Sequence, residues 1–492
     1  MRHSRQDLPV AALAAIALVV CAVGCGDPSP KTRSVGGSRT VTFWSDSGKS
    51  SPQPSGDIRP PAAIRAWTPD GKTSVTGLID SGGGFHLDGV AEGAYVFELA
   101  TSAGRRHFFR TEAAQLDLGF DDLGRSDLRV PTQATPVTFD VTGLAPADPQ
   151  DLVEMTSSNA SLWERLAPQG TLSSGSTSAS LSFDWHARPT PLLRGSEGDV
   201  LFVHQLSTQQ DAASGLSYQT AQSWGQLPSD AAVTDGAAET LSVALAPVTS
   251  TGRLDVRWRT STFEVLSQWP PNTQITGHSL FIEGIAWQLD LGPNPWNGFP
   301  DLLSVPAPPG TADVSLSLGY GRFLPSLWKE RLQAYVTARF RYPYLGGTIF
   351  YSGRMSVQAS MDAPPSELTP TIFPPQGVRI GNVDTLQVRT GVGTGPLFSW
   401  AAPSLGTPDH YVVDVEELVV SGTTVTFTPL ATFDTTETRA QFPDGTLTAG
   451  RQYVAWVTAA REPTGHYATA PAPYRRHFPQ DVAQVATAPF SP

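Results

Sequence analysis

The chain has 492 residues, a formal net charge of −12 and 16% charged residues, where roughly 25% is usual. At roughly 150 residues per domain, this length predicts about three domains. The basic residues form no stripe along the sequence, which argues against a nucleic-acid partner. The 45 glycines and 43 prolines separate short alternating apolar segments, a pattern that predicts an all-β fold.

The N-terminus has the pattern of an export signal. Arg2 and Arg5 precede an apolar run over residues 8–20, and small residues follow up to Cys25. This pattern resembles the lipobox of bacterial lipoproteins, in which a signal peptidase cuts before the cysteine and a diacylglyceryl group is attached to its sulfur. Ala22 stands where that family prefers leucine.

The resemblance implies a signal peptide at residues 1–24, a lipid on Cys25 and membrane attachment through that lipid in a bacterial cell envelope. Gly26 follows the cysteine where an aspartate would favour the inner membrane, so the outer membrane or cell surface is expected. An ordinary secretory signal cut nearby is the alternative. The run is shorter than the roughly 20 residues of a membrane-spanning helix.

Cys21 and Cys25 are the only cysteines in the sequence. If Cys25 is lipidated, the folded part has no thiol for a disulfide, a Cys-zinc site or a cysteine nucleophile. Residues 25–38 are rich in Pro, Ser and Gly and are predicted to be a disordered, lipid-anchored tether.

Residues 39–115 are predicted to form the first β-sandwich. Residues 40–44 alternate as an opening strand, and 77–100 contain two more strands around Gly84-Phe85 and Gly93-Ala94-Tyr95. This motif resembles the carboxypeptidase regulatory-like, transthyretin-like β-sandwich, although one extra glycine departs from the family's spacing. The resemblance implies a non-catalytic β module.

Residues 116–127 are predicted to be a connector carrying four aspartates. They lack the order of a calcium-binding EF-hand loop, so a solvated turn is expected.

The central region resembles no known family. Short strands separated by turns favour two sandwiches, at residues 131–247 and 248–361, with one large sandwich or an incomplete propeller left open. No strand is predicted within the Ser/Thr-rich stretch before residue 181. The clearest strand is 332–342, whose apolar and polar residues alternate strictly, as in an antiparallel strand covered on one side.

Three aromatic residues of the central region lie in Pro/Gly-rich loops: Trp269, Trp296 and Phe299. Aromatic rings in such loops can stack on sugar rings or anchor a protein partner, so these are the candidate ligand-binding residues. The alternative is that they plug the ends of the core.

Residues 371–480, after a Pro-rich hinge, resemble a fibronectin type III domain. Trp400 occupies the position of the core tryptophan, and residues 447–459 match the family's L-x-P-G-x-x-Y-x-x-x-V-x-A with Ala449 in place of proline. The resemblance implies that Gly450 permits a corner and that the Tyr453 hydroxyl bonds backbone there while its ring packs.

No catalytic motif is present. The sequence lacks a G-x-S-x-G elbow, an H-E-x-x-H pair and a P-loop, and its histidines are scattered without metal-ligand spacing. We therefore expect no catalytic residue, no metal and no cofactor, and no enzyme.

The sequence as a whole predicts a cell-envelope surface lipoprotein with a binding or structural role, partnered by an envelope protein or polysaccharide. A glycan-binding protein using the central aromatic loops is the alternative. A hydrolase with its site in residues 131–361 is a lesser one.

Overall fold

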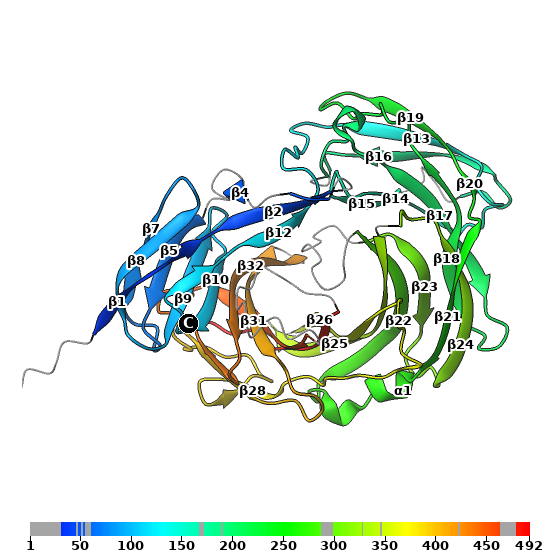
Figure 1. The fold of residues 1–492 in the computed structure, drawn as a ribbon. Coiled ribbons are helices and arrows are strands. Elements are labelled where there is room, and N and C mark those ends of the chain that lie inside the picture. The colour runs from blue at the N-terminus through cyan, green and yellow to red at the C-terminus, as the bar shows by residue number, and fades with distance from the viewer. Residues whose placement is uncertain are drawn as a thin grey trace, which may run out of the picture.

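The computed structural model describes residues 31–45, 48–50, 53–54, 61–166, 172–187, 190–286, 299–326, 328–344, 347–421, 424–462 and 479–492. Regular structure in these ranges is almost entirely β-strand. The strands form four two-sheet sandwiches that follow one another around a ring (Figure 1). The prediction of an all-β chain of tandem β-sandwiches is therefore confirmed.

The first sandwich packs the sheet β11–β1–β8–β7 on the sheet β6–β5–β9–β10. Val35 and Phe85 of one sheet and Ile64 and Phe97 of the other are buried between them, with the two phenylalanine ring centroids 5.6 Å apart. The strands are β1 (Thr32–Ser38), β5 (Pro61–Trp67), β6 (Ser74–Thr76), β7 (Leu78–Ile79), β8 (Gly84–Ala91), β9 (Tyr95–Thr101), β10 (Arg106–Thr111) and β11 (Gln115–Asp117).

The opening strand of this sandwich is β1, so the tether predicted for residues 25–38 is wrong for residues 32–38. Val35 is fully buried, and β1 pairs with β8 on one side and β11 on the other. Gly37 lies so close to β11 that a Cβ there would come within 2.0 Å of the Leu116 carbonyl oxygen. This stretch is poor in apolar residues, but it forms a strand because Val35 fills the core and Gly37 allows the close approach of β11. Cys25 lies outside the described residues.

The second sandwich packs β16–β13–β19 on a sheet in which β15, β14, β17 and β18 are neighbours in that order. Phe139 and Leu181 meet Met155 and Val203 in its core. The strands are β13 (Pro136–Thr142), β14 (Leu152–Ser157), β15 (Leu162–Leu166), β16 (Ser178–Asp184), β17 (Phe202–Gln210), β18 (Ser217–Gln226), β19 (Glu239–Ala244) and β20 (Ala246–Pro247), with the short 3-10 turn η2 (Gly195–Glu197).

The third sandwich packs β24–β21–β27 on β23–β22–β25–β26. The alternation predicted for residues 332–342 is confirmed, because its apolar residues are all fully buried while Arg339 and Arg341 are exposed. The elements are β21 (Ser250–Trp258), α1 (Thr260–Phe263), η3 (Leu266–Gln268), β22 (Thr273–Ala286), β23 (Asp301–Ala307), β24 (Val314–Arg322), β25 (Trp328–Tyr344), β26 (Gly347–Ser360) and β27 (Glu367–Leu368).

The fourth sandwich packs β29–β28–β30–β33 on β32–β31–β34–β35. Trp400 and Phe398 of the first sheet meet Tyr411 and Val413 of the second. The strands are β28 (Gln376–Ile380), β29 (Val383–Asp384), β30 (Leu397–Ala401), β31 (His410–Ser421), β32 (Thr424–Thr435), β33 (Arg439–Gln441), β34 (Gln452–Arg461) and β35 (Asp481–Ala486).

One continuous sheet runs through all four sandwiches. β10 of the first pairs in parallel with β32 of the fourth, β35 of the fourth pairs with β26 of the third, and β23 of the third pairs with β18 of the second. The spatial order is therefore first, fourth, third, second. The first sandwich thus lies beside the last one in sequence.

A ribbon built on β2 (Thr40–Ser45) and β12 (Phe120–Leu123) closes the ring on its other side. The two strands pair in parallel, and β3 (Gly48–Lys49) and β4 (Gln53–Pro54) pair with β2. Residues 40–44, predicted to open the first sandwich, thus leave it for this ribbon. A buried cluster joins the ribbon to the third sandwich, and its members are Trp44, Leu123, Ala286 and Trp328.

Candidate functional site

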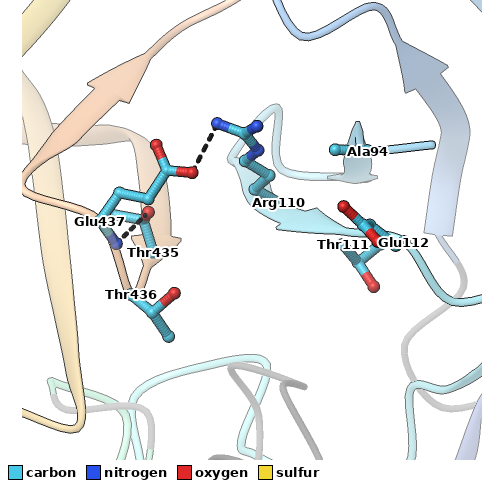
Figure 2. Close-up of a pocket in the computed structure, with 7 residues that line it drawn as sticks. All are labelled: Ala94, Arg110, Thr111, Glu112, Thr435, Thr436 and Glu437. Atoms are coloured by element: carbon cyan, nitrogen blue, oxygen red, sulfur yellow. Dashed lines mark hydrogen bonds and ion pairs between the residues drawn. The ribbon is translucent and has the colours of Figure 1, made fainter.

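A small pocket lies where the first sandwich meets the fourth (Figure 2). Its volume is about 190 Å³. The guanidinium of Arg110 on β10 and the carboxylate of Glu437 after β32 lie 2.7 Å apart across it. The residues that line it are Ala94, Arg110, Thr111, Glu112, Thr435, Thr436 and Glu437.

The charges in this pocket are largely satisfied by one another. Glu437 also accepts a hydrogen bond from Arg439 Nε at 2.8 Å, and its backbone N–H donates to Thr435 Oγ1 at 3.0 Å. The lining contains no Ser, His, Cys or Asp. The site can hold a small polar molecule, with hydroxyls from its threonines and carboxylates from Glu112 and Glu437.

A second cluster, which we call the buried charge cluster, lies between the second and third sandwiches. Glu154 on β14 is fully buried and accepts a hydrogen bond from Arg165 Nε at 2.8 Å. The same guanidinium donates to Asp301 of β23 at 3.0 Å. The backbone N–H of Asp301 donates to Glu154 at 3.2 Å. One arginine thus bridges two carboxylates from different sandwiches.

Further groups surround Glu154. Trp163 Nε1 donates to it at 3.2 Å, and His204 Nε2 lies 3.4 Å from its carboxylate. Burial alone would raise the pKa of Glu154, but hydrogen bonding and charge from His204 and Arg165 outweigh burial and hold that pKa below its ordinary value. Glu154 is therefore an ionised carboxylate.

Asp301 is in the opposite electrostatic state. Burial, followed by the nearby charges of Glu154 and Glu283, raises the pKa of Asp301 well above its ordinary value. Glu283 is itself paired with Arg331 at 2.6 Å. The cluster thus holds three carboxylates and two guanidiniums, together with the His204 ring, and Asp301 is the acid whose pKa is raised.

Two carboxylates with pKa values shifted in opposite directions are typical of an acid–base pair in catalysis. Here, however, both Glu154 and Asp301 are buried, and neither lines the pocket described above. A substrate has no described route to them. The cluster holds two sandwiches together.

Two of the candidate aromatic residues, Trp269 and Phe299, are buried in the structure. Trp269 is only 4% exposed, donates its Nε1–H to the Phe263 carbonyl at 3.3 Å and packs on Phe340. Phe299 is buried beneath the guanidinium of Arg331, 4.6 Å from the ring centroid. Both rings act in packing. Trp296 lies outside the described residues.

The three signature residues of the fourth sandwich lie in its core and at its corner. Trp400 packs on Tyr411 with ring centroids 5.2 Å apart. Tyr453 is buried and its hydroxyl accepts the Thr448 N–H at 2.9 Å. Gly450 adopts a left-handed φ of 78°. This is the geometry of a tyrosine corner, in which one aromatic ring both fills the core and ties down a loop.

Neither a metal site nor a membrane helix is present in the described ranges. No group of three or more His, Cys, Asp or Glu side chains there is placed to hold a metal ion. The aspartates of the connector make local contacts: Asp117 accepts the Gly119 N–H at 2.8 Å, and Asp127 pairs with Arg125 and Arg194. No helix in these ranges has the length and hydrophobicity needed to span a bilayer.

Comparisons with known proteins give a limited picture. No family model matches the chain, and no curated protein matches it. Among solved structures, the FN1–FN3 domains of chicken CNTN1 are 9% identical, with 75% of this chain and 89% of that chain covered, at a TM-score of 0.13.

Two structures of repeat units give similar values. Two B repeat units of the collagen-binding protein of Staphylococcus aureus are 9% identical, covering 93% and 100% of the two chains at a TM-score of 0.12. A tetra-tandem repeat from the extending region of a large adhesion protein is 13% identical, covering 92% and 99% at 0.11. At such TM-scores the likenesses carry no argument about this chain, and its assignment as tandem β-sandwiches rests on its own strand pairings.

Proposed function

We propose that the chain is an exported, lipid-anchored envelope protein with a non-catalytic binding or structural role. In this proposal its four sandwiches act as one rigid body. The continuous sheet that passes from each sandwich to the next supports it most directly. A string of independent modules would instead be joined by mobile linkers with small polar interfaces.

At the joints, apolar side chains are buried in addition to the strand pairings. The apolar core of the third sandwich runs without a break into that of the fourth, and Phe108 of the first belongs to the same cluster. A body built this way keeps its surfaces at fixed positions, which is what a scaffold or a binding platform requires.

The anchor is the second part of the proposal. Cys25 would carry the lipid, and β1 starts at the outer tip of the first sandwich (Figure 1). The lipid would therefore hold the body by one corner and leave the other sandwiches free to face the surroundings.

Metabolic labelling with an alkyne fatty acid tests the anchor. We expect the wild-type protein to incorporate the label and to fractionate with membranes, and Cys25→Ser to lose both. Cys21→Ser, four residues earlier in the leader, is the matched control and should keep both. An unlabelled wild-type protein, or a Cys25→Ser variant labelled like the wild type, would overturn the anchored placement.

A further inference from the structure

The β22–β25–β26 sheet of the third sandwich has an outward face that differs from the rest of the molecule. On β25 the residues that alternate with the buried apolar ones lie on the side of the sheet opposite to β21 and β24. Figure 1 shows this side of the sheet facing the middle of the ring. We call this the inner face. Its ladder is regular, and β25 and β26 pair without a bulge from Arg331–Ser360 to Tyr344–Gly347, so the side chains on it are held in fixed rows.

The inner face is basic. Arg339, Arg341 and Arg354 all point to it and are exposed. In the described part of the chain, Arg339 and Arg341 form no ion pair. Residues 274–281, 333–343 and 348–356 of these strands contain no Asp or Glu. This is unusual in a chain with 45 acidic and 33 basic side chains. Glu283, the next residue on this face of β22 after Phe281, is paired with Arg331.

Aromatic rings alternate with these charges. Phe281 of β22 and Tyr335 of β25 are half-buried and lie nearly parallel, with centroids 5.7 Å apart and planes 13° apart. Phe350 is 47% exposed, and the Arg339 guanidinium sits 5.3 Å from its ring centroid. That contact holds the guanidinium in place without neutralising its charge.

From this face we infer a binding surface for an anionic polysaccharide, one that carries carboxylate or sulfate groups on its sugar rings. Aromatic rings offer flat apolar surfaces on which the C–H faces of sugars can stack. The planar guanidinium of arginine can donate two parallel hydrogen bonds to one carboxylate or sulfate group. Same-face residues along a strand repeat about every 6.8 Å, so the face suits an extended polymer better than a small ligand.

The inference deepens the proposed function, since it names the kind of partner that an envelope protein would meet. It places the aromatic contacts on strands, whereas Trp269 and Phe299, expected from the sequence to bind a ligand, are buried. Polysaccharide binding does not depend on the lipid anchor, because it can be measured on the purified protein with or without acylation. The labelling experiment and the binding experiment can therefore fail independently.

The test is equilibrium binding of the purified full chain to polygalacturonate, with neutral dextran and inorganic polyphosphate as comparison polymers. We expect binding to polygalacturonate that weakens when sodium chloride rises from about 50 mM to about 500 mM, because salt screens exposed charges. Arg339→Gln/Arg341→Gln should weaken it by about tenfold or more, since both charges face the polymer. The matched control, Arg253→Gln/Arg257→Gln on the opposite sheet of the same sandwich, should bind like the wild type.

The aromatic part is tested with Tyr335→Ala. We expect weaker binding to polygalacturonate and unchanged binding to polyphosphate, because only the sugar polymer uses the ring. Circular dichroism and the thermal midpoint establish that each variant is folded. Equal binding by the wild type and the double arginine variant, equal binding to dextran, or tighter binding to polyphosphate or to DNA than to polygalacturonate would overturn the inference.

Discussion

The joint between the first and fourth sandwiches and the joint between the second and third are built on opposite principles. At the first–fourth joint, Phe108 packs against both Phe433 and Phe442, with centroid distances of 6.1 and 5.7 Å. The buried carboxylate there, Glu98, faces two guanidiniums, Arg65 and Arg106. Apolar packing forms this joint together with two ion pairs across it, Arg105–Asp414 and Arg110–Glu437.

The second–third joint instead depends on buried charged groups. Its buried charge cluster contains three carboxylates, two guanidiniums and the His204 ring, and the pKa of Asp301 is raised within it. A buried ion network contributes less stability than apolar packing of the same volume, but breaking one member is costly because the others stay buried without a partner. The comparison teaches that one ring can contain a joint packed mainly through aromatic rings and a joint built on a buried network of charged groups.

The largest effect should come from Glu154→Ala. The change leaves Arg165 Nε, Trp163 Nε1 and the Asp301 backbone N–H without their acceptor, and we expect the free energy of unfolding to fall by about 4 kcal/mol. Urea denaturation measures it. Asp140→Ala is the control, since that exposed carboxylate accepts only the Ser180 hydroxyl at 2.9 Å in the described structure, and about 0.5 kcal/mol is expected. Equal losses in the two variants would contradict the account.

Phe108→Ala should cost about 3 kcal/mol through the cavity it leaves. Its neighbour Phe109 points into the core of the first sandwich instead, so Phe109→Ala is a matched control with a similar loss of stability. Only Phe108→Ala should speed hydrogen exchange at the β32 amides that pair with β10. Faster exchange there in both variants, or in neither, would show that Phe108 does not hold the joint.

The pH dependence of the second–third joint should disappear in Asp301→Asn. A pKa raised in the folded state means that folding favours the protonated acid, so this contribution is present below the unfolded pKa and is lost as pH rises through the folded value. The wild type should therefore lose stability as pH rises through the raised pKa of Asp301, and Asp301→Asn should show a flatter profile. Thermal unfolding in steps of pH measures both, and parallel profiles would refute the assignment.

The smallest effect is expected at the corner of the fourth sandwich. Tyr453→Phe removes the acceptor of the Thr448 N–H and should cost about 1 kcal/mol. Tyr351→Phe is the control, because that hydroxyl is buried without a hydrogen-bond partner among the described residues, and its removal should cost nothing. The denaturant midpoints of the two variants measure these changes in stability. A larger loss of stability in Tyr351→Phe than in Tyr453→Phe would contradict the prediction.

Sequence patterns predict those parts of the fold in which each strand has one buried and one solvated face. The strand 332–342 is such a case, and its strict alternation matches the burial of its side chains. Spaced signature residues likewise predict the fourth sandwich, where Trp400 and Tyr453 occupy the core.

The joints could not be predicted in this way. β14 shows no alternation because both of its faces are buried: Val153 and Met155 face the core of the second sandwich, while Glu154 faces the third. The partner of Glu154 across the joint, Asp301, is 147 residues away in sequence. Charge and spacing within one segment carry no information about such a pairing.

The central claim is that the four sandwiches form one rigid body, and the distance between two spin labels tests it directly. Labels at His86→Cys on β8 and Ser242→Cys on β19, with Cys21 and Cys25 changed to serine, report on the first and second sandwiches, which no sheet pairing joins directly. The account predicts a single narrow distance distribution that broadens in Phe108→Ala. A broad distribution in the otherwise unchanged protein would show that the sandwiches move independently and would contradict it.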